Sequence, residues 1–357
     1  MSCTLLFVGC LGSGERRAAI RIYDFNPVAG SAVLLSETDT IDAPVFMAAD
    51  IRNRRLYVAS ETRNGVLVAC SVDVETGHLS EIARQATRGD SPCHIDFDRT
   101  RRFVFVSNFG VGAARSASAQ SMAVLPVEPT LMPATATVRH DGSGPALPYQ
   151  DGPHAHCAVA SPDNRFVLVA DFGTDEIVSY PFDQGTGQLG AKASVCKMPP
   201  GAAARTLVFA RDERTVFATA EMMSSVATLD WDAAAGSLTL RTMDATVPPG
   251  TSVTNYPAEI VLSRDGRFLY AANRGHDSIA VFAVTERGLR PAATYPSGGS
   301  WPRCFCRNDD GSLLIVANQK SGEIVLFAAD RATGALTARG IIAHAPTPAF
   351  VGHATFD

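Results

Sequence analysis

A repeating unit of about fifty residues is the feature that most constrains the fold of this chain. Each copy has a polar or proline start, an apolar stretch, a turn rich in Asp, Asn or Gly, a second apolar stretch and a polar end residue. Clear copies span 92–108 (PCHIDFDRTRRFVFVSN), 154–171 (HAHCAVASPDNRFVLVAD) and 257–273 (PAEIVLSRDGRFLYAAN). Weaker copies end at 61, 221 and 318, and 4–10 match only the second half of the unit. The seven end positions, 10, 61, 108, 171, 221, 273 and 318, predict seven repeats.

Each repeat has room for four short β-strands joined by hairpin turns. In one repeat we expect strands at 158–160, 166–170, 176–182 and 188–197, separated by turns that contain Pro-Asp-Asn, Gly-Thr-Asp and Gly-Thr-Gly. No helical period of about 3.6 residues is sustained anywhere. We therefore predict an all-β fold, a seven-bladed β-propeller with four antiparallel strands per blade, in a single domain that spans 1–357.

The two ends of the chain are predicted to share one blade. The first repeat lacks its leading strand, and a spare apolar stretch at 349–356 follows the last complete repeat. We expect this stretch to pair beside 4–8 as the innermost strand of that blade, which closes the ring and removes an open sheet edge. The segment 112–151, rich in Ala, Ser, Pro and Gly, is expected to form a loop over one face.

Composition narrows the classes of function. The 357 residues carry a formal net charge of −5, which argues against a nucleic-acid-binding protein. No run reaches the about 18 apolar residues that a membrane-spanning helix needs. The eight cysteines are scattered without a Cys-x-x-Cys pair, as expected for reduced thiols in the cytoplasm. We expect a cytoplasmic protein without nucleic-acid or membrane partners; its oligomeric state is left open.

Polar side chains are expected to gather at one mouth of the central channel. In an antiparallel blade, the start of the innermost strand and the end of the next strand lie at the same end. The starts supply His94, His154, His156, Arg205, Glu259 and Arg303. The ends supply Glu61, Asn108, Asp171, Glu221, Asn273, Arg274, Asn318 and Gln319. Polar groups beside apolar strands need partners, so we predict that a polar ligand or water fills this mouth.

Two of these positions carry unusual charges. Glu221 ends the predicted apolar strand TVFATAE, where an unpaired carboxylate would be costly, and Arg205 is placed by the repeat to supply the opposite charge. This pair is open to a structural and to a catalytic interpretation. Arg274 stands where a turn-forming residue would suffice, which favours anion binding.

Several of these residues also have plain structural interpretations. Strand-ending Asn and Asp side chains commonly hydrogen-bond their own turns, which applies to Asn108, Asp171, Asn273 and Asn318. His94 can be a buried wall residue, and Arg303 can form an ion pair between blades. The other histidines considered, His140, His276, His344 and His353, are expected at the surface or in turns. His154 and His156 could share a metal ion, but no third ligand follows by local spacing, so no metal or cofactor is predicted.

The chain resembles the seven-bladed lactonase family over nearly its whole length. The resemblance is carried by GPHAHCAVASPDNRFVLVADFGTDEIVSY, AEIVLSRDGRFLYAANRGHDSIAVF and WPRCFCRNDDGSLLIVANQKSGEIVLF. That family includes a bacterial type of 6-phosphogluconolactonase and the fungal 3-carboxy-cis,cis-muconate lactonizing enzymes. Resemblance to the latter implies a channel site of one His, two Arg and one Glu. On matching positions these are His156, Arg205, Glu221 and Arg274, with His154 beside the first.

The function that we expect is hydrolysis of a small anionic sugar-acid lactone, similar to 6-phosphoglucono-δ-lactone. Arg205 and Arg274 would hold a carboxylate or phosphate and stabilise the developing oxyanion. His156 or Glu221 would serve as general base for the attacking water. The predicted substrate-binding residues around them are His94, His154, Asp171, Glu259, Arg303 and Asn318. Two alternatives stay open: a cycloisomerase that forms a lactone from a carboxylated muconate, and a non-enzymatic propeller that binds a protein partner.

Overall fold

The computed structural model describes residues 3–12, 17–110 and 119–356. These residues form seven antiparallel sheets, together with a short 3₁₀ helix, Glu221–Met223. Six sheets consist of strands that are consecutive in the chain, and one joins the first three strands to the last. The seven sheets confirm the predicted all-β, seven-bladed propeller. The contacts divide the chain into two compact units: unit 1 comprises Met1–Tyr57, Cys70–Ile82 and Asp244–Asp357, and unit 2 comprises Val58–Ala69 and Ala83–Met243. That the whole chain is one domain stays a prediction.

Unit 1 contains three complete sheets. The first has the order β29 (Pro348–Phe356), β1 (Cys3–Cys10), β2 (Ala19–Asn26) and β3 (Ser31–Thr38). The second consists of β21 (Tyr256–Leu262), β22 (Phe268–Arg274), β23 (Ser278–Thr285) and β24 (Gly288–Pro296). The third consists of β25 (Pro302–Arg307), β26 (Leu313–Asn318), β27 (Glu323–Ala329) and β28 (Leu336–His344).

Unit 2 contains three sheets, except that the last two residues of strand β20 belong to unit 1. One consists of β8 (Pro92–Phe97), β9 (Phe103–Asn108), β10 (Met122–Pro126) and β11 (Ala136–Val138). The next consists of β12 (Ala155–Ala160), β13 (Phe166–Asp171) and β14 (Glu176–Asp183), with both β15 (Gln188–Leu189) and β16 (Ser194–Lys197) paired to β14. The third consists of β17 (Ala204–Phe209), β18 (Thr215–Ala220), β19 (Ser225–Asp232) and β20 (Ser237–Ala245). The seventh sheet, with residues of both units, consists of β4 (Pro44–Asp50), β5 (Arg55–Ser60), β6 (Val66–Val72) and β7 (Leu79–Ala86).

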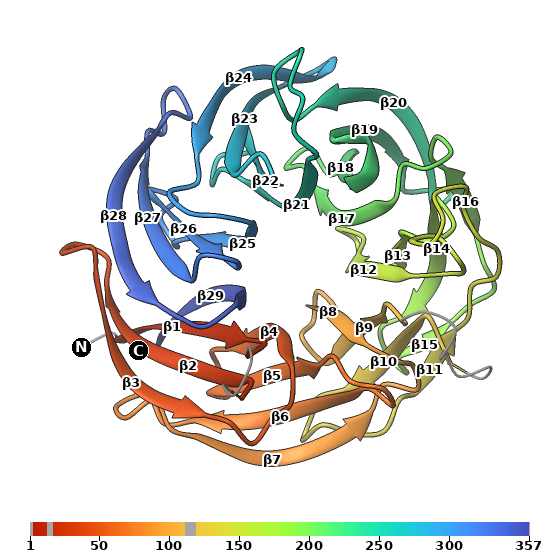
Figure 1. The fold of residues 1–357 in the computed structure, drawn as a ribbon. Helices are drawn as coiled ribbons and strands as arrows, with labels where there is room; N and C mark the ends of the chain where they lie inside the picture. The colour runs from red at the N-terminus through yellow and green to blue at the C-terminus, as the bar shows by residue number, and fades with distance from the viewer. Residues whose placement is uncertain (1–2, 13–16, 111–118, 357) are drawn as a thin grey trace. The chain divides into compact units, whose positions relative to one another are not determined.

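The chain ends meet in one sheet of unit 1, as predicted. Strand β29 lies antiparallel to β1, with a register that runs from Cys3 opposite Phe356 to Cys10 opposite Pro348 (Figure 1). Strand β1 is therefore covered by β2 on one side and by β29 on the other. The C-terminal strand supplies the innermost position that the N-terminal repeat lacks.

Two sequence expectations for individual segments are corrected by the structure. The segment 112–151 is not a single loop, because it contains β10 and β11 of a blade; residues 112–118 lie outside the described residues. The strand expected at 188–197 is split into β15 and β16. The split falls at Gly190, whose amide donates to Pro181 O, while β16 pairs further back along β14.

Blades pack on each other through apolar faces and a recurring turn. The second strands, such as β9 and β13, are buried along their whole length, as strands covered on both faces should be. A phenylalanine at the start of the second strand packs against a glycine in the turn between the third and fourth strands of the next blade. The pairs are Phe103 with Gly187, Phe166 with Gly236 and Phe268 with Gly334. These glycines have positive φ angles of 65–73°, and a β-carbon would overlap the ring.

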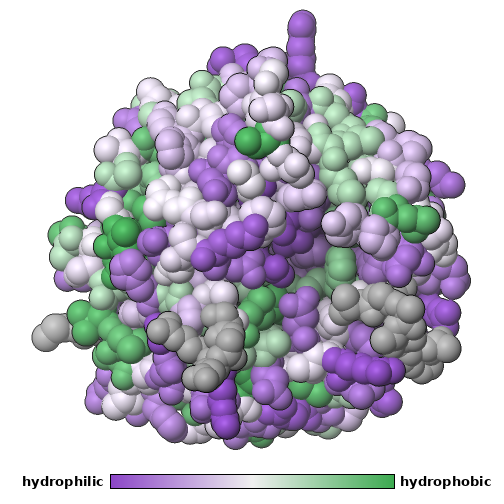
Figure 2. Space-filling view, viewed as in Figure 1, coloured by the Kyte–Doolittle hydropathy of each residue, from purple (hydrophilic) through white to green (hydrophobic). Residues whose placement is uncertain are grey.

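Figure 2 shows that hydrophilic side chains cover much of the surface in this view, with smaller hydrophobic areas between them. Exposed apolar residues include Val28 and Leu147. Within the described ranges, none of the helices has the length and apolar character needed to cross a membrane.

Candidate active site

A β-bulge near the start of the innermost strands sets the local geometry of the predicted site. In unit 2, the register of β12 with β13 skips His156, and that of β17 with β18 skips Arg205 and Thr206. In unit 1, β21 skips Ala258 and Glu259, and β25 skips Arg303. A bulge adds a residue to one strand and re-aims its side chain, and bulges are common beside active sites. Four of the predicted site residues are therefore in or next to a backbone irregularity that recurs from blade to blade.

Arg205 and Glu221 form the charged centre of unit 2. Arg205 Nη1 donates to Glu221 Oε2 at 3.1 Å, and the two side chains are only 10% and 12% exposed. Glu221 begins the 3₁₀ helix directly after β18, and its amide donates to Ala203 O. Arg205 Nε is buried without a hydrogen-bond partner among the residues that the structure describes. The guanidinium thus combines one carboxylate contact with an unused buried donor.

The two histidines of the His-x-His segment have different surroundings. His154 precedes β12, with Nδ1 2.7 Å from Phe109 O and Nε2 3.0 Å from Asp151 Oδ1. Its ring stacks on Phe109, whose ring also meets the edge of His156 at 5.6 Å between centroids. Both ring nitrogens of His154 therefore lie within hydrogen-bond distance of oxygen atoms of the protein itself. In the described part of the chain, no three His, Cys, Asp or Glu side chains are arranged to hold a metal.

Asp171 is fully buried at the end of β13 and organises the loops beside His154. Its Oδ1 accepts from the amides of His154, Gly173 and Thr174, and its Oδ2 lies 2.7 Å from His140 Nδ1. Burial alone would raise the pKa of Asp171, but the hydrogen bond and charge of His140 and the backbone donors hold that pKa below its usual value. His140 is 3% exposed, so its expected place at the surface is wrong. Its burial follows from the pairing with Asp171, which no local sequence pattern announces.

His94 is a buried neutral residue at the start of β8. Its Nε2 lies 3.5 Å from Cys157 Sγ. Burial, with a smaller contribution from the positive charge of Arg205, lowers the pKa of His94 to about 3. The imidazole is therefore uncharged at neutral pH and would contact a ligand only as a neutral group.

Unit 1 holds the other predicted residues. Arg274, at the end of β22, is 6% exposed; its Nε donates to Tyr256 O, and its guanidinium lies 5.8 Å from the ring centre of Trp301. Lys320 Nζ lies 3.4 Å from the same ring centre. Asn273 pairs with Pro257 just before the bulge of its blade, as Ala220 pairs with Ala204. Arg274 follows Asn273 as Glu221 follows Ala220, so the two charged residues occupy equivalent positions of their blades.

The remaining predicted substrate-binding residues are Glu259, Arg303 and Asn318, of which Arg303 is half-buried in β25. Half-buried Glu259 lines a cavity of about 440 Å³ together with Cys304, Cys306 and Phe350. Burial, with help from Glu259, raises the pKa of Cys306 to about 12, so this thiol stays protonated. Asn318 is fully buried, and its Nδ2 donates to Ser297 O. Asn108 and Asn273 make equivalent bonds to Thr87 O and Thr246 O, which ties each second strand to the segment that enters its blade.

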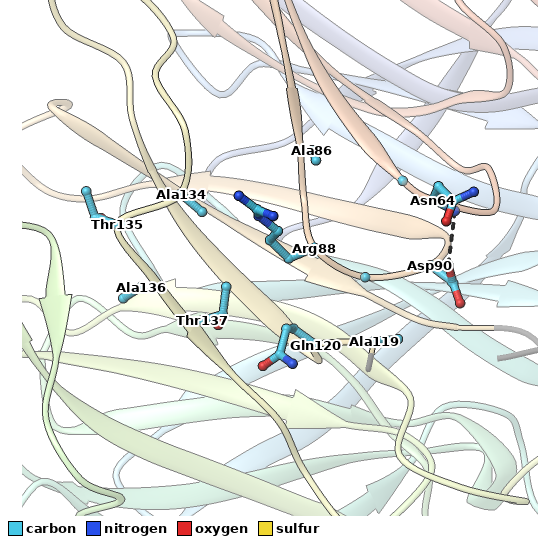
Figure 3. A pocket seen from close by; sticks show the side chains of 12 residues that line it. Asn64, Ala86, Arg88, Asp90, Ala119, Gln120, Ala134, Thr135, Ala136 and Thr137 are labelled. Atoms are coloured by element: carbon cyan, nitrogen blue, oxygen red, sulfur yellow. Dashed lines mark hydrogen bonds between the residues drawn. The ribbon is translucent and has the colours of Figure 1, made fainter. Parts of the chain in front are cut away.

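A cavity of about 540 Å³ in unit 2 contains none of the predicted residues. Figure 3 shows Arg88 at its centre and the hydrogen bond from the Asn64 amide to Asp90 Oδ1 at its edge. Small side chains such as Ala134 and Ala136 form much of its lining, so it is wide but has few groups that could do chemistry. Size alone therefore does not identify the site, and the buried charges at Arg205 and Glu221 are the stronger indication.

Comparison with known proteins gives a consistent family. The family model described as "Lactonase, 7-bladed beta-propeller" matches residues 5–352. The 6-phosphogluconolactonase of Bacillus subtilis is 28% identical, over 97% of each chain. A 6-phosphogluconolactonase of Formosa agariphila is 30% identical, over 93% of this chain and 94% of its own. The periplasmic gluconolactonase PpgL of Pseudomonas aeruginosa superposes with a TM-score of 0.88 at 27% identity, over 99% of both chains. Fold, repeat pattern and comparison agree, and the chain belongs to the lactonase family of seven-bladed β-propellers, a family of lactone-hydrolysing enzymes.

Proposed function

We propose that this enzyme hydrolyses a small anionic sugar-acid lactone of the 6-phosphoglucono-δ-lactone type, with Arg205, Glu221 and His156 at the centre of its site. The observation that carries the proposal is the state of Arg205. The Arg205 side chain is about one-tenth exposed, pairs with one carboxylate and has a buried Nε–H without an acceptor among the described residues. This Nε–H can donate a hydrogen bond to an oxyanion. The two relatives named 6-phosphogluconolactonase support the substrate class.

The reaction needs no covalent intermediate. Water attacks the lactone carbonyl carbon while a general base takes its proton, and the carbonyl oxygen becomes an oxyanion that Arg205 stabilises. The tetrahedral intermediate then breaks its bond to the ring oxygen, which receives the proton back from the base. The product is the open-chain hydroxy acid. Either His156 or Glu221 can act as the base. His156 lies near the start of β12, the innermost strand of its blade, and Glu221 lies just beyond β18, the second strand of the neighbouring blade.

The other residues have supporting roles in this proposal. Arg274 occupies in its own blade the position that Glu221 has in its blade. That Arg274 binds the phosphate or carboxylate of a substrate, with Arg303 and Glu259 as further polar contacts, stays a prediction from the sequence. Asp171 and His154 act by positioning, because their polar atoms are already engaged within the protein. Asn318 holds the end of its strand. We further propose a cytoplasmic location, supported by six buried thiols that act as small apolar side chains.

Proton release on incubation with purified protein tests the function directly. The assay compares 6-phosphogluconolactone, gluconolactone and carboxylated muconates, with spontaneous hydrolysis subtracted. We expect turnover of a lactone, strongest with the phosphorylated one, and loss of that turnover in Arg205→Met. Arg274→Met should raise KM more than it lowers kcat. Turnover of muconates alone would establish a cycloisomerase instead, and an inactive but correctly folded protein would refute the proposal.

A further inference from the structure

We infer that the thiol of Cys93 is a positioning group for His156, one of the two candidate bases. The contact runs within unit 2, from the innermost strand of one blade to the innermost strand of the next. Its consequence for catalysis rests on the proposed function, whereas the contact itself can be tested without turnover.

Cys93 occupies in its blade the position that His156 has in the next blade. The register of β8 with β9 skips Cys93, as the register of β12 with β13 skips His156. Each residue is therefore the extra residue of a bulge, where a side chain is re-aimed. Sequence spacing predicts His94 as the site residue of β8, but the register makes Cys93 the counterpart of His156.

The Cys93 thiol contacts the peptide groups on both sides of His156. Cys93 Sγ donates to His156 O at 3.5 Å and to Ala155 O at 3.7 Å. Carbonyl oxygens only accept, so the single thiol hydrogen is shared between these two oxygens. Cys93 is only 3% exposed, which shelters the contact from water. Since the two flanking peptide planes set the direction of a side chain, this contact fixes the direction in which His156 leaves the backbone.

The direction of His156 matters for the chemistry proposed. The residue is 7% exposed, and its ring meets the edge of Phe109 at 5.6 Å between centroids. A general base must come within about 2.6–3.2 Å of the atom whose proton it takes. A displacement of about 1 Å at a reacting group can cost as much as about 100-fold in rate. A small rotation of the bulge would therefore lower kcat without removing any catalytic residue.

A second thiol makes a similar contact at the next junction between blades. The Leu207 amide donates to Cys157 Sγ at 3.4 Å, and Leu207 is the first paired residue after the bulge that contains Arg205. Sulfur is an acceptor here and a donor at Cys93, and an alkyl side chain can be neither. Thiols thus contact the bulges on both sides of β12, which favours a role beyond filling space.

Two variants of Cys93 separate hydrogen bonding from packing. With 6-phosphogluconolactone, Cys93→Ala should lower kcat about three- to tenfold, as expected for one neutral hydrogen bond, and leave KM unchanged. Cys93→Ser should recover most of that loss, because its hydroxyl donates to the same oxygens. Packing alone predicts the reverse order, since a buried hydroxyl without a partner costs more than a methyl group. Cys196→Ala, which removes a thiol 6% exposed in β16 of the same unit, is the matched control and should keep the parental kcat.

NMR of the histidine rings tests the contact independently of turnover. The His156 signal is assigned by its loss in His156→Asn. We expect this signal to shift in Cys93→Ala and to return toward its parental position in Cys93→Ser. His140, held by Asp171 in the same unit, is the internal reference and should not shift.

The combined results decide the inference. An unchanged His156 signal in Cys93→Ala, or a shift that Cys93→Ser does not reverse, would overturn it. Parental kcat in Cys93→Ala would overturn it as well, provided that the parent hydrolyses the lactone. A parent that hydrolyses no lactone would refute the proposed function, and the ring signals alone would then decide whether Cys93 orients His156.

Discussion

At the scale of single residues, the buried Arg205–Glu221 pair joins stability to chemistry. Removing one member of a buried ion pair leaves the other charge without compensation, which typically costs about 3–5 kcal/mol. The same pair stands where the proposed oxyanion and base are needed. Variants at these positions therefore need a measurement of folding beside every measurement of rate.

Glu221→Gln keeps the shape of the side chain but removes its charge. If Glu221 is the general base, kcat for the preferred lactone should fall about 100-fold or more. The unfolding free energy should also fall, and Arg205→Met combined with Glu221→Gln should recover part of it, because no unpaired charge then remains. Urea unfolding of the single and double variants separates these effects. Near-parental kcat in a folded Glu221→Gln would assign the base role to His156, which His156→Asn then tests.

His94 predicts a pH dependence of stability. The pKa of His94 is about 3 in the folded protein and 6.5 for the free side chain. Below pH 6.5, His94 is therefore protonated in the unfolded chain but stays neutral in the folded protein until the pH approaches 3. The free energy of unfolding is therefore unaffected by His94 above pH 6.5, and it decreases as the pH falls from 6.5 toward 3. His94→Gln should show a flatter loss of unfolding free energy than the parent between pH 7 and pH 4, by up to about 1.4 kcal/mol per pH unit. Parallel curves for parent and variant would contradict the assigned pKa.

How far sequence reasoning reaches can be judged from the residues of the site. The residues Asn108, Asp171 and Asn318 were placed at strand ends because apolar alternation and turn chemistry mark such ends locally. The bulges at His156 and Arg205 depend on which backbone groups pair, and side-chain type does not reveal them. The His140–Asp171 contact spans 31 residues and two loops, so no local pattern carries it. Glu221, which the repeat predicts to end its strand, lies one residue beyond that strand in the structure.

At the scale of elements, the docking of one blade on the next relies on glycine. Gly236 and Gly250 both have positive φ, at 65° and 82°, so alanine strains the backbone at either position by about 1–2 kcal/mol. Only at Gly236 does the added carbon meet the Phe166 ring, whereas nothing lies within 4 Å at Gly250. Gly236→Ala should thus lower the unfolding free energy by a further about 1–3 kcal/mol relative to Gly250→Ala, the usual cost of overpacking. Equal losses in urea unfolding would show that this contact yields without strain.

The element scale also explains why the strands were easier to predict than their pairing. Three blades carry Arg-Phe at the start of the second strand, and Arg102, Arg165 and Arg267 each donate to a carbonyl in the turn of the next blade. The dipeptide is visible in the sequence, but its partner turn lies 64–82 residues away. Periodicity therefore identified the unit, while the contact between units needed the folded chain.

At the scale of the whole molecule, the pairing of the two chain ends decides whether the first sheet is complete. Strand β29 covers one edge of β1 over its full length, and without it β1 would present unpaired backbone groups along a strand of apolar residues. The repeat predicted this arrangement because the N-terminal copy lacked one strand and the C-terminus carried one to spare. The contact joins residues about as far apart in the chain as any pair can be, so its formation carries a large loop-closure entropy cost.

A charge placed in β29 tests how much the fold depends on this contact. Val351 is 1% exposed and lies opposite Val8, so Val351→Asp buries a carboxylate without a partner. We expect the Tm to fall by about 5 °C, because a loss of about 4 kcal/mol is divided by an unfolding entropy of about 2.1 cal/mol/K for each of the 357 residues. Val33→Asp is the matched control, since Val33 is 61% exposed in the outer strand of the same sheet and should change the Tm little. Deletion of residues 349–357 is the second test. If this deletion lowers the Tm no more than Val33→Asp does, the terminal strand is dispensable. The stability of this propeller would then reside in contacts between consecutive blades alone.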